Sequence, residues 1–347
     1  MTTQDTDVAV DAATETVLEM VGDVWAFKVL AAAVELGLFA ALGRGRKASK
    51  EDLEATLGLP ERSADLLVAA CTSLGLLDKD GDRYRNSALS EAVLVPDSPN
   101  ELGGAVTYVD TRSWRSWGRL TEALLTNRPT ARDPDVQDPS FAVEDPAMLD
   151  RFRRALNNLG RSTARTVADV YDLGTHDRLL DIGAGSGCYA IELCSAYDGL
   201  TATCYDLPHV VPLTQTEIDQ AGMADRIATV GGDFFADEVL PGGHDVALLA
   251  AILHDWDEAT GRMLLAKCHA ALPPGGVLLI CELLLDDDRT GPPPAALMGL
   301  NRLVETERGR AYTAAQYRSW LLDAGFREVT RVPCKSPGAN AVLVARA

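Results

Sequence analysis

A run of apolar residues that ends in alternating glycines constrains this chain more than any other feature. Residues 179–182 predict a buried strand that includes Asp181, and Gly183, Gly185 and Gly187 follow at every second position. Only a residue without a Cβ lets the backbone pass this close to a ligand. A strand, a glycine turn and a helix in this order predict a nucleotide-type binding site.

The spacing of the glycines separates two kinds of ligand. The dinucleotide fingerprint G-x-G-x-x-G needs its third glycine at position 188, where this chain has Cys188. The G-x-G-x-G form found here is typical of S-adenosylmethionine enzymes, because the methionine part of that molecule lies against the loop. On this motif alone, NAD stays open as the alternative.

Two later strands end in residues suited to the rest of such a ligand. Residues 201–206 predict a strand that ends in Asp206, about 20 positions after the turn, where a carboxylate can accept hydrogen bonds from ribose hydroxyls. The alternative is that Asp206 caps the next helix. Asp233 and Phe234 follow a strand over 226–230 and can offer an acceptor and a ring face to adenine. A turn followed by core aromatics explains these two residues equally well.

Composition excludes several classes of protein. The 347 residues suffice for two domains, and 47% apolar with 24% charged residues is typical of a soluble globular chain. No apolar run approaches the roughly 18 residues of a membrane span, and the N-terminus is acidic rather than signal-like, so we expect a cytoplasmic protein. Seven cysteines without Cys-x-x-Cys pairs indicate reduced core thiols. A net charge of −19 disfavours nucleic acid and membranes as partners.

The N-terminal part predicts helices followed by a hairpin. A long helical region over 14–42 is apolar on most faces at 25–34, so it needs a cover, either a second subunit or the rest of the chain. Helices over 50–57 and 60–73 before a hairpin have the outline of a winged helix. A DNA-binding regulator is the rival interpretation, but the recognition helix would offer Arg62 and no basic cluster.

The C-terminal part alternates apolar strands with helices, which predicts a mostly parallel sheet covered on both faces. The last two strands must be antiparallel, because the segment between them is too short for a crossover. We expect an α/β, Rossmann-like domain over 146–347 and a helical, winged-helix-like domain over 1–145. The expected strands cover residues 178–182, 201–206, 226–230, 244–252, 277–284, 328–333 and 339–345.

One of the five histidines stands at the carboxyl end of a predicted strand. His254 and Asp255 follow the strand over 244–252, and ligands lie beyond the carboxyl ends of strands in open α/β sheets. We therefore predict His254 as a general base, with a capping imidazole as the alternative. Glu282 ends the next strand and is expected to hold one imidazole nitrogen, unless it is a solvated strand end. Asp255 is expected to position the acceptor or the backbone.

The order of these motifs resembles a known family, the S-adenosylmethionine-dependent O-methyltransferases of the plant caffeate type and their bacterial relatives in aromatic natural-product pathways. The motifs are Asp181-x-Gly183-x-Gly185-x-Gly187, Tyr205-Asp206-Leu207-Pro208, Gly232-Asp233-Phe234-Phe235, Leu253-His254-Asp255-Trp256, Pro274-Gly275-Gly276 and Glu282. The resemblance covers nearly the whole chain. It implies a seven-stranded methyltransferase sheet and a homodimer formed through the N-terminal domain, which helps to cover the substrate pocket of the neighbouring subunit. It also implies a cofactor site for S-adenosylmethionine, and for the product S-adenosylhomocysteine, made of Asp181, Gly183, Gly185, Gly187, Asp206, Leu207, Gly232, Asp233 and Phe234.

One run departs from the family's pattern. Where the family commonly has Gly-Gly-Arg/Lys-Glu-Arg-Thr, with the glutamate beside the histidine, this chain has Ala311. Either Glu282 suffices, or Glu305 or Glu307 substitutes, or the chemistry is altered, since some relatives methylate carbon and some methylate nothing. Iron-binding relatives add a third ligand, but no histidine follows Leu283, so no metal is expected.

The sequence therefore predicts methyl transfer from S-adenosylmethionine to a hydroxyl of a small aromatic acceptor. A C-methyltransferase or a non-methylating relative is the alternative, and a winged-helix regulator is more remote. Residues expected to line the acceptor site, with ordinary packing as the alternative for each, are Trp114, Phe152, Leu156, Met298 and Asn301.

Overall fold

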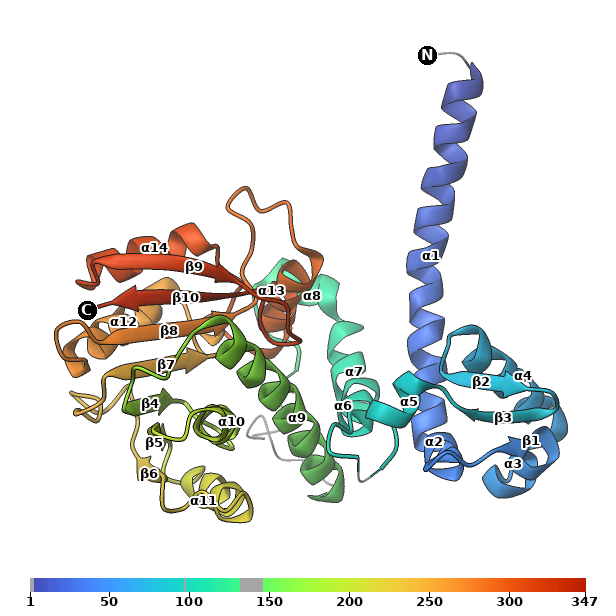
Figure 1. Ribbon diagram of the computed structural model, residues 1–347. Helices are drawn as coiled ribbons and strands as arrows, with labels where there is room; N and C mark the ends of the chain where they lie inside the picture. Colours follow the sequence, from blue (N-terminus) through green and yellow to red (C-terminus); the bar gives the residue numbers. More distant parts are fainter. Residues whose placement is uncertain (1–2, 97, 132–145) are drawn as a thin grey trace. The chain divides into compact units, whose positions relative to one another are not determined.

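The computed structural model describes the backbone of residues 3–96, 98–131 and 146–347 (Figure 1). Side chains are described for 11–96, 98–131 and 153–347. Two compact units are present: an N-terminal unit of Met1–Trp114 with Phe141–Asn158, and a C-terminal unit of Arg115–Ser140 with Leu159–Ala347. The division at Asn158 falls within one long helix, and the predicted domain boundary at 145/146 stays a prediction.

The N-terminal unit is helical with one small sheet. Its three short strands pair antiparallel in the order β1-β3-β2. The helices α3 and α4 before the hairpin β2–β3 have the predicted winged-helix outline. The elements are α1 (Thr3–Glu35), α2 (Leu38–Leu42), β1 (Ala48–Ser49), α3 (Lys50–Leu57), α4 (Glu61–Ser73), β2 (Leu77–Asp80), β3 (Arg83–Asn86), α5 (Ala88–Val93), α6 (Gly103–Tyr108) and the π-helical turn η1 (Val109–Ser113).

Local chemistry explains where these helices begin and end. Ser49 and Asp52 form a capping box at the start of α3, in which each side chain binds the other's backbone N–H. The predicted helical region over 14–42 is two helices rather than one. Gly37, with φ of 75°, separates them, since this left-handed conformation ends α1 at Glu35 and is one that glycine adopts freely.

The C-terminal unit contains the large sheet. Helix α7 (Trp114–Trp117) begins at the last residue of the N-terminal unit, and α9 (Pro146–Val170) is shared by both units. The other elements are α8 (Leu120–Thr126), β4 (Arg178–Ile182), α10 (Cys188–Ala196), β5 (Thr201–Asp206), α11 (Val211–Gln220), β6 (Ile227–Gly231), β7 (Val246–Ala250), the 3₁₀ turn η2 (Leu253–Asp255), α12 (Glu258–Ala271), β8 (Val277–Glu282), α13 (Pro293–Glu305), α14 (Ala314–Asp323), β9 (Glu328–Pro333) and β10 (Ala341–Arg346).

Seven strands form this sheet in the order β6-β5-β4-β7-β8-β10-β9 (Figure 1). Strands β4 to β8 pair parallel, and β10 pairs antiparallel with both β8 and β9, as the sequence predicts. Alternate strand residues enter different cores: Leu180 and Ile182 pack with residues of α12 and α14, and Leu179 packs with residues of α9, α10 and α11. The sheet is therefore covered on both faces.

The connections reverse direction in the middle of this sheet. From β4 the chain moves outward to β5 and β6, and it then returns to the other side of β4 for β7 and β8. A crevice forms at such a reversal, beyond the carboxyl ends of the strands, and is the usual ligand site of open α/β sheets. Among the described residues, no helix is both long and apolar enough to span a membrane.

Candidate active site

The glycine turn after β4 is packed at its two ends and open in its middle. Gly183, Gly185 and Gly187 have φ of 71°, 56° and 76°, a region that side chains other than glycine rarely adopt. A Cβ on Gly183 would overlap Ile252, and one on Gly187 would come within 3.1 Å of Thr214. A Cβ on Gly185 would meet no atom within 4 Å. The backbone at Gly185 is therefore open to a ligand.

Asp206 ties the end of β5 to this turn. Its Oδ2 accepts the N–H of Gly185 at 2.7 Å, and its Oδ1 accepts the N–H of Leu207 at 2.7 Å. Helix α11 begins later, with Val210 at its N-cap, so the capping alternative for Asp206 is wrong. A carboxylate has about four acceptor sites, which leaves lone pairs for hydroxyl donors of a ligand.

The end of β6 joins the same edge through an aromatic cluster. Gly232 lies against the ring of Tyr205, which a Cβ would overlap. The Asp233 carboxylate accepts the N–H of Phe235 at 2.8 Å. The rings of Phe234 and Phe235 meet Trp256 at centroid distances of 6.0 and 4.7 Å. This cluster connects β6 with the segment that carries His254.

Asp181, within β4, is a buried carboxyl group with an unmade hydrogen bond. It is 1% exposed, and its Oδ2 has no partner among the described residues. Burial raises the pKa of Asp181 to about 7, an interaction with the backbone of Ala190 opposes this, and the charge of Asp206 adds to it. A free acceptor in the strand that leads into the glycine turn fits a ligand that brings hydrogen-bond donors or positive charge.

The raised pKa of Asp181 predicts that folding stability depends on pH. The folded protein favours the neutral carboxyl, so its contribution is complete below the ordinary pKa of 3.8 and is lost as pH rises through about 7. Asp181→Asn cannot ionise. Between pH 5 and 8 we expect the free energy of unfolding of the wild type to fall by about 2 to 4 kcal/mol relative to Asp181→Asn.

Urea denaturation of both proteins at pH 5, 6, 7 and 8 measures this difference. Asp219→Asn is the matched control, because Asp219 is an exposed carboxylate on α11. It should run parallel to the wild type. If Asp181→Asn ran parallel as well, Asp181 would be ionised throughout the range.

His254 is held through its backbone from two sides. Ala251, with φ of 54°, turns the chain out of β7 into η2, which makes β7 shorter than predicted. The N–H of His254 donates to Glu282 Oε1 at 3.2 Å, and its carbonyl accepts the N–H of Arg310 at 2.8 Å. Gly309 permits this close packing, since a Cβ there would lie 2.6 Å from the His254 carbonyl oxygen.

Glu282 does not hold the imidazole as predicted. Its Oε1 binds the backbone N–H of His254, and its Oε2 accepts the hydroxyl hydrogen of Tyr317 at 2.6 Å. It is also 1% exposed, so the solvated alternative is wrong too. The reason is that the side chain lies in the interior beside α14, where Tyr317 meets it. Tyr317 is absent from the sequence-based site because its helical position indicates only burial.

The carboxylate beside the imidazole is that of Asp255. His254 Nε2 lies 3.7 Å from Asp255 Oδ1, and the same oxygen accepts a hydrogen bond from Arg302 Nη1 at 2.6 Å. Ala311, 6% exposed, offers the ring no acceptor. Arg302 reaches Asp255 from α13, a contact between distant segments for which the sequence carries no signal.

The residues predicted to line the acceptor site fall in both units. Met298 and Asn301 lie on α13, the helix of Arg302, and Asn301 Oδ1 accepts the indole N–H of Trp117 at 3.0 Å. In the N-terminal unit, Trp114 stacks on Phe27 at 5.8 Å and Leu156 is 46% exposed. The side chain of Phe152 lies outside the described residues.

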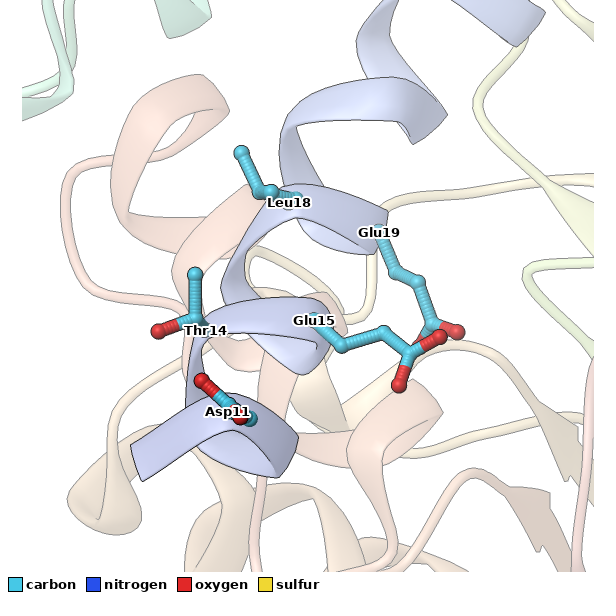
Figure 2. A pocket seen from close by; sticks show the side chains of 5 residues that line it. All are labelled: Asp11, Thr14, Glu15, Leu18 and Glu19. Carbon is cyan, nitrogen blue, oxygen red and sulfur yellow. The ribbon is translucent and has the colours of Figure 1, made fainter. Parts of the chain in front are cut away.

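The described residues form neither a metal site nor an enclosed pocket on α1. Within 11–96, 98–131 and 153–347, no three His, Cys, Asp or Glu side chains lie together as metal ligands. A shallow hollow follows α1, and Figure 2 shows that all of its lining side chains come from that one helix. A hollow lined by a single helix has no opposite wall to enclose a ligand. Its lining residues are Asp11, Thr14, Glu15, Leu18 and Glu19.

Comparison with known proteins gives concordant results. An O-methyltransferase domain model matches residues 117–327, and an O-methyltransferase dimerisation domain model matches residues 18–96. The chain is 46% identical to a 3-hydroxy-5-methyl-1-naphthoate 3-O-methyltransferase of Streptomyces sahachiroi, over 92% of this chain and 91% of that protein. It is 32% identical to a tetracenomycin polyketide synthesis 8-O-methyl transferase of Streptomyces glaucescens, over 94% and 95% of the two chains. The structure of human N-acetylserotonin methyltransferase in complex with S-adenosylmethionine superposes with a TM-score of 0.83 at 31% identity, covering 96% of this chain and 97% of that one.

Proposed function

Because this chain belongs to the O-methyltransferase family, we propose that it transfers the methyl group of S-adenosylmethionine to a hydroxyl of a small aromatic acceptor in natural-product biosynthesis. One observation carries this proposal. The glycine turn after β4 and His254 after β7 lie at the two strands between which the order of the sheet reverses. Donor and base are thereby expected at one crevice.

The residues along this edge fit the donor. Asp206 has lone pairs for ribose hydroxyls, Gly185 leaves its backbone open, and Asp181 has a buried oxygen without a partner. Asp233 and Phe234 are assigned to the adenine, and Gly183, Gly187, Leu207 and Gly232 to the backbone that shapes the site. When bound, S-adenosylmethionine supplies a methyl group on a positively charged sulfur.

His254 is assigned as the general base of the transfer. His254 is 9% exposed as a whole residue, and its backbone is fixed by Glu282 and Arg310, so the residue is held at one place on the edge. The neutral ring would accept the proton that the acceptor hydroxyl loses as its oxygen takes the methyl group, while the bond from sulfur to methyl breaks and S-adenosylhomocysteine leaves. Such a positioned base contributes typically about 100- to 10,000-fold to the rate. Exclusion of water and alignment of the reactants supply much of the remainder.

The acceptor is assigned by analogy with the relatives. The Streptomyces sahachiroi protein acts on a hydroxynaphthoate by name, so we propose a fused or substituted hydroxyaryl compound for this chain. Incubation with methyl-labelled S-adenosylmethionine and a panel of hydroxynaphthoates tests this, with mass spectrometry to place the label. Label on oxygen supports the proposal. Label on carbon alone, or none with any hydroxyaryl acceptor, contradicts it.

We further propose that the protein acts as a homodimer through its N-terminal domain. Within the N-terminal unit, α1 exposes apolar side chains that include Leu18, Met20 and Trp25, at 63%, 65% and 69% exposure. Exposed apolar surface of this extent is typical of an interface. We also propose, from the sequence, that the protein is cytoplasmic.

Negative charge placed among these exposed apolar side chains of α1 should separate the subunits. We expect Leu18→Glu combined with Met20→Glu to shift the molar mass in light scattering from dimer toward monomer. Thr16→Glu, an exposed position on the same helix, is the control and should stay dimeric. A double variant that remains fully dimeric would place the interface elsewhere.

A further inference from the structure

We propose that Arg302 is a positioning residue for the methyl transfer, which it serves by restraining Asp255 beside the His254 imidazole. The inference rests on the proposed role of His254 as the base. Arg302, on α13, would act through Asp255 and would not touch the reactants.

The geometry places one carboxylate oxygen between two groups. Asp255 Oδ1 lies 2.6 Å from Arg302 Nη1 and 3.7 Å from His254 Nε2. The oxygen therefore accepts a hydrogen bond from the guanidinium and lies near the imidazole ring, but too far away to accept a hydrogen bond from it. The Arg302, His254 and Asp255 side chains are 18%, 11% and 34% exposed, so solvent screens this partly buried arrangement less than a pair on the open surface.

This distance decides whether Nε2 of the ring can act as a base. In neutral imidazole one nitrogen carries the proton and the other has the free lone pair. If Asp255 moved to within hydrogen-bond distance of Nε2, it would hold the proton on that nitrogen and leave the lone pair on Nδ1 instead. By binding the same oxygen, Arg302 keeps the carboxylate close enough to stabilise the imidazolium that forms during reaction, yet off the nitrogen.

Among the described residues, Arg302 is the cation whose side chain pairs with Asp255. Around His254, Glu282 is engaged by the His254 N–H and the Tyr317 hydroxyl, and Arg310 contributes its backbone N–H. Arg302 itself is held incompletely, because its Nε is buried without a partner among the described residues. Packing alone would be served by an apolar side chain without that unmade hydrogen bond. The guanidinium is therefore better explained by its contact with Asp255.

Arg302→Met tests this inference, since methionine is unbranched and apolar. We expect kcat to fall on the order of 10- to 100-fold, with the Kd for S-adenosylmethionine within about twofold. Loss of the positive charge should also favour the protonated ring. The acid limb of the kcat/KM profile should therefore move up by about 0.5 to 2 pH units. Arg302→Lys should restore the position of this limb and recover part of kcat.

A second change separates positioning from general damage. In Arg302→Met combined with Asp255→Asn, the amide can no longer accept the proton as a charged partner, so kcat should recover relative to Arg302→Met alone. Arg308→Met is the matched control, because Arg308 pairs with Asp257 at 3.2 Å, is 66% exposed, and should leave kcat unchanged. Melting temperatures identify any variant that is only misfolded.

Two results would overturn the inference. One is an Arg302→Met enzyme with wild-type kcat and pH profile. The other is a lower kcat with an unmoved acid limb and no recovery in the double variant, which would indicate a merely structural role. The proposed function fails separately, if His254 itself proves dispensable. An essential His254 with a dispensable Arg302 would refute this inference alone.

Discussion

His254→Gln lowers kcat by about 100- to 10,000-fold and leaves the Kd for S-adenosylmethionine within about twofold of the wild-type value. This result is expected because glutamine fills a similar volume and keeps the backbone contacts to Glu282 and Arg310, but has no lone pair of suitable basicity. The cofactor residues at β4, β5 and β6 do not depend on the ring. The loss should therefore appear in kcat and not in donor binding.

Activity assays with a hydroxyaryl acceptor measure kcat, and calorimetric titration measures the Kd for S-adenosylmethionine. His269→Gln is the control, because the His269 ring, on α12, packs against Phe326 and has no part in the proposed site. Its kcat should equal that of the wild type. A kcat for His254→Gln within threefold of the wild type would remove His254 from the mechanism.

The second large effect is expected at Asp206. Asp206→Ala removes the acceptor that holds the Gly185 N–H and the proposed partner of the ribose hydroxyls. Hydrogen bonds to a charged group contribute about 1.5 to 3 kcal/mol each. We therefore expect the Kd for S-adenosylmethionine and for S-adenosylhomocysteine to rise about 100-fold. At saturating donor, kcat should change far less, since His254 is untouched.

Calorimetric titration with both molecules provides the measurement, and Asp219→Ala is the control at an exposed carboxylate of α11. The control should bind both molecules as the wild type does. If Asp206→Ala bound the donor normally, Asp206 would serve only to brace the glycine turn, and the ribose assignment would be lost.

Local pattern was sufficient for most of the fold. Strands β4, β5 and β9 have the predicted bounds, because each is an apolar or alternating run with polar or turn residues at its ends. The winged-helix outline followed from the two short helices predicted over 50–57 and 60–73 and the hairpin after them. Errors occurred where a single backbone angle decides the boundary, as at Gly37, which divides the first helical region, and at Ala251, which shortens β7.

For the candidate site, the sequence predicted which residues lie at the edge of the sheet but not which groups they contact. Positions at the carboxyl ends of parallel strands meet at one edge, so His254, Glu282, Asp206 and the glycine turn could be assigned to it from the sequence. Their partners could not. Glu282 meets the backbone of a residue 28 positions away and the hydroxyl of one 35 positions away. Such pairs depend on how α14 and η2 pack against the sheet.

By itself, then, the sequence determined the succession of elements, the glycine turn and the residues offered at the edge of the sheet, because these depend on short-range periodicity and spacing. The tertiary structure alone decided which carboxylate stands beside the imidazole. Asp255, hydrogen-bonded by Arg302 across 47 residues, occupies that place, while Glu282 accepts the backbone N–H of His254. The physical reason is that a side chain's partner is chosen by long-range packing, which brings together groups whose separation along the chain carries no signal.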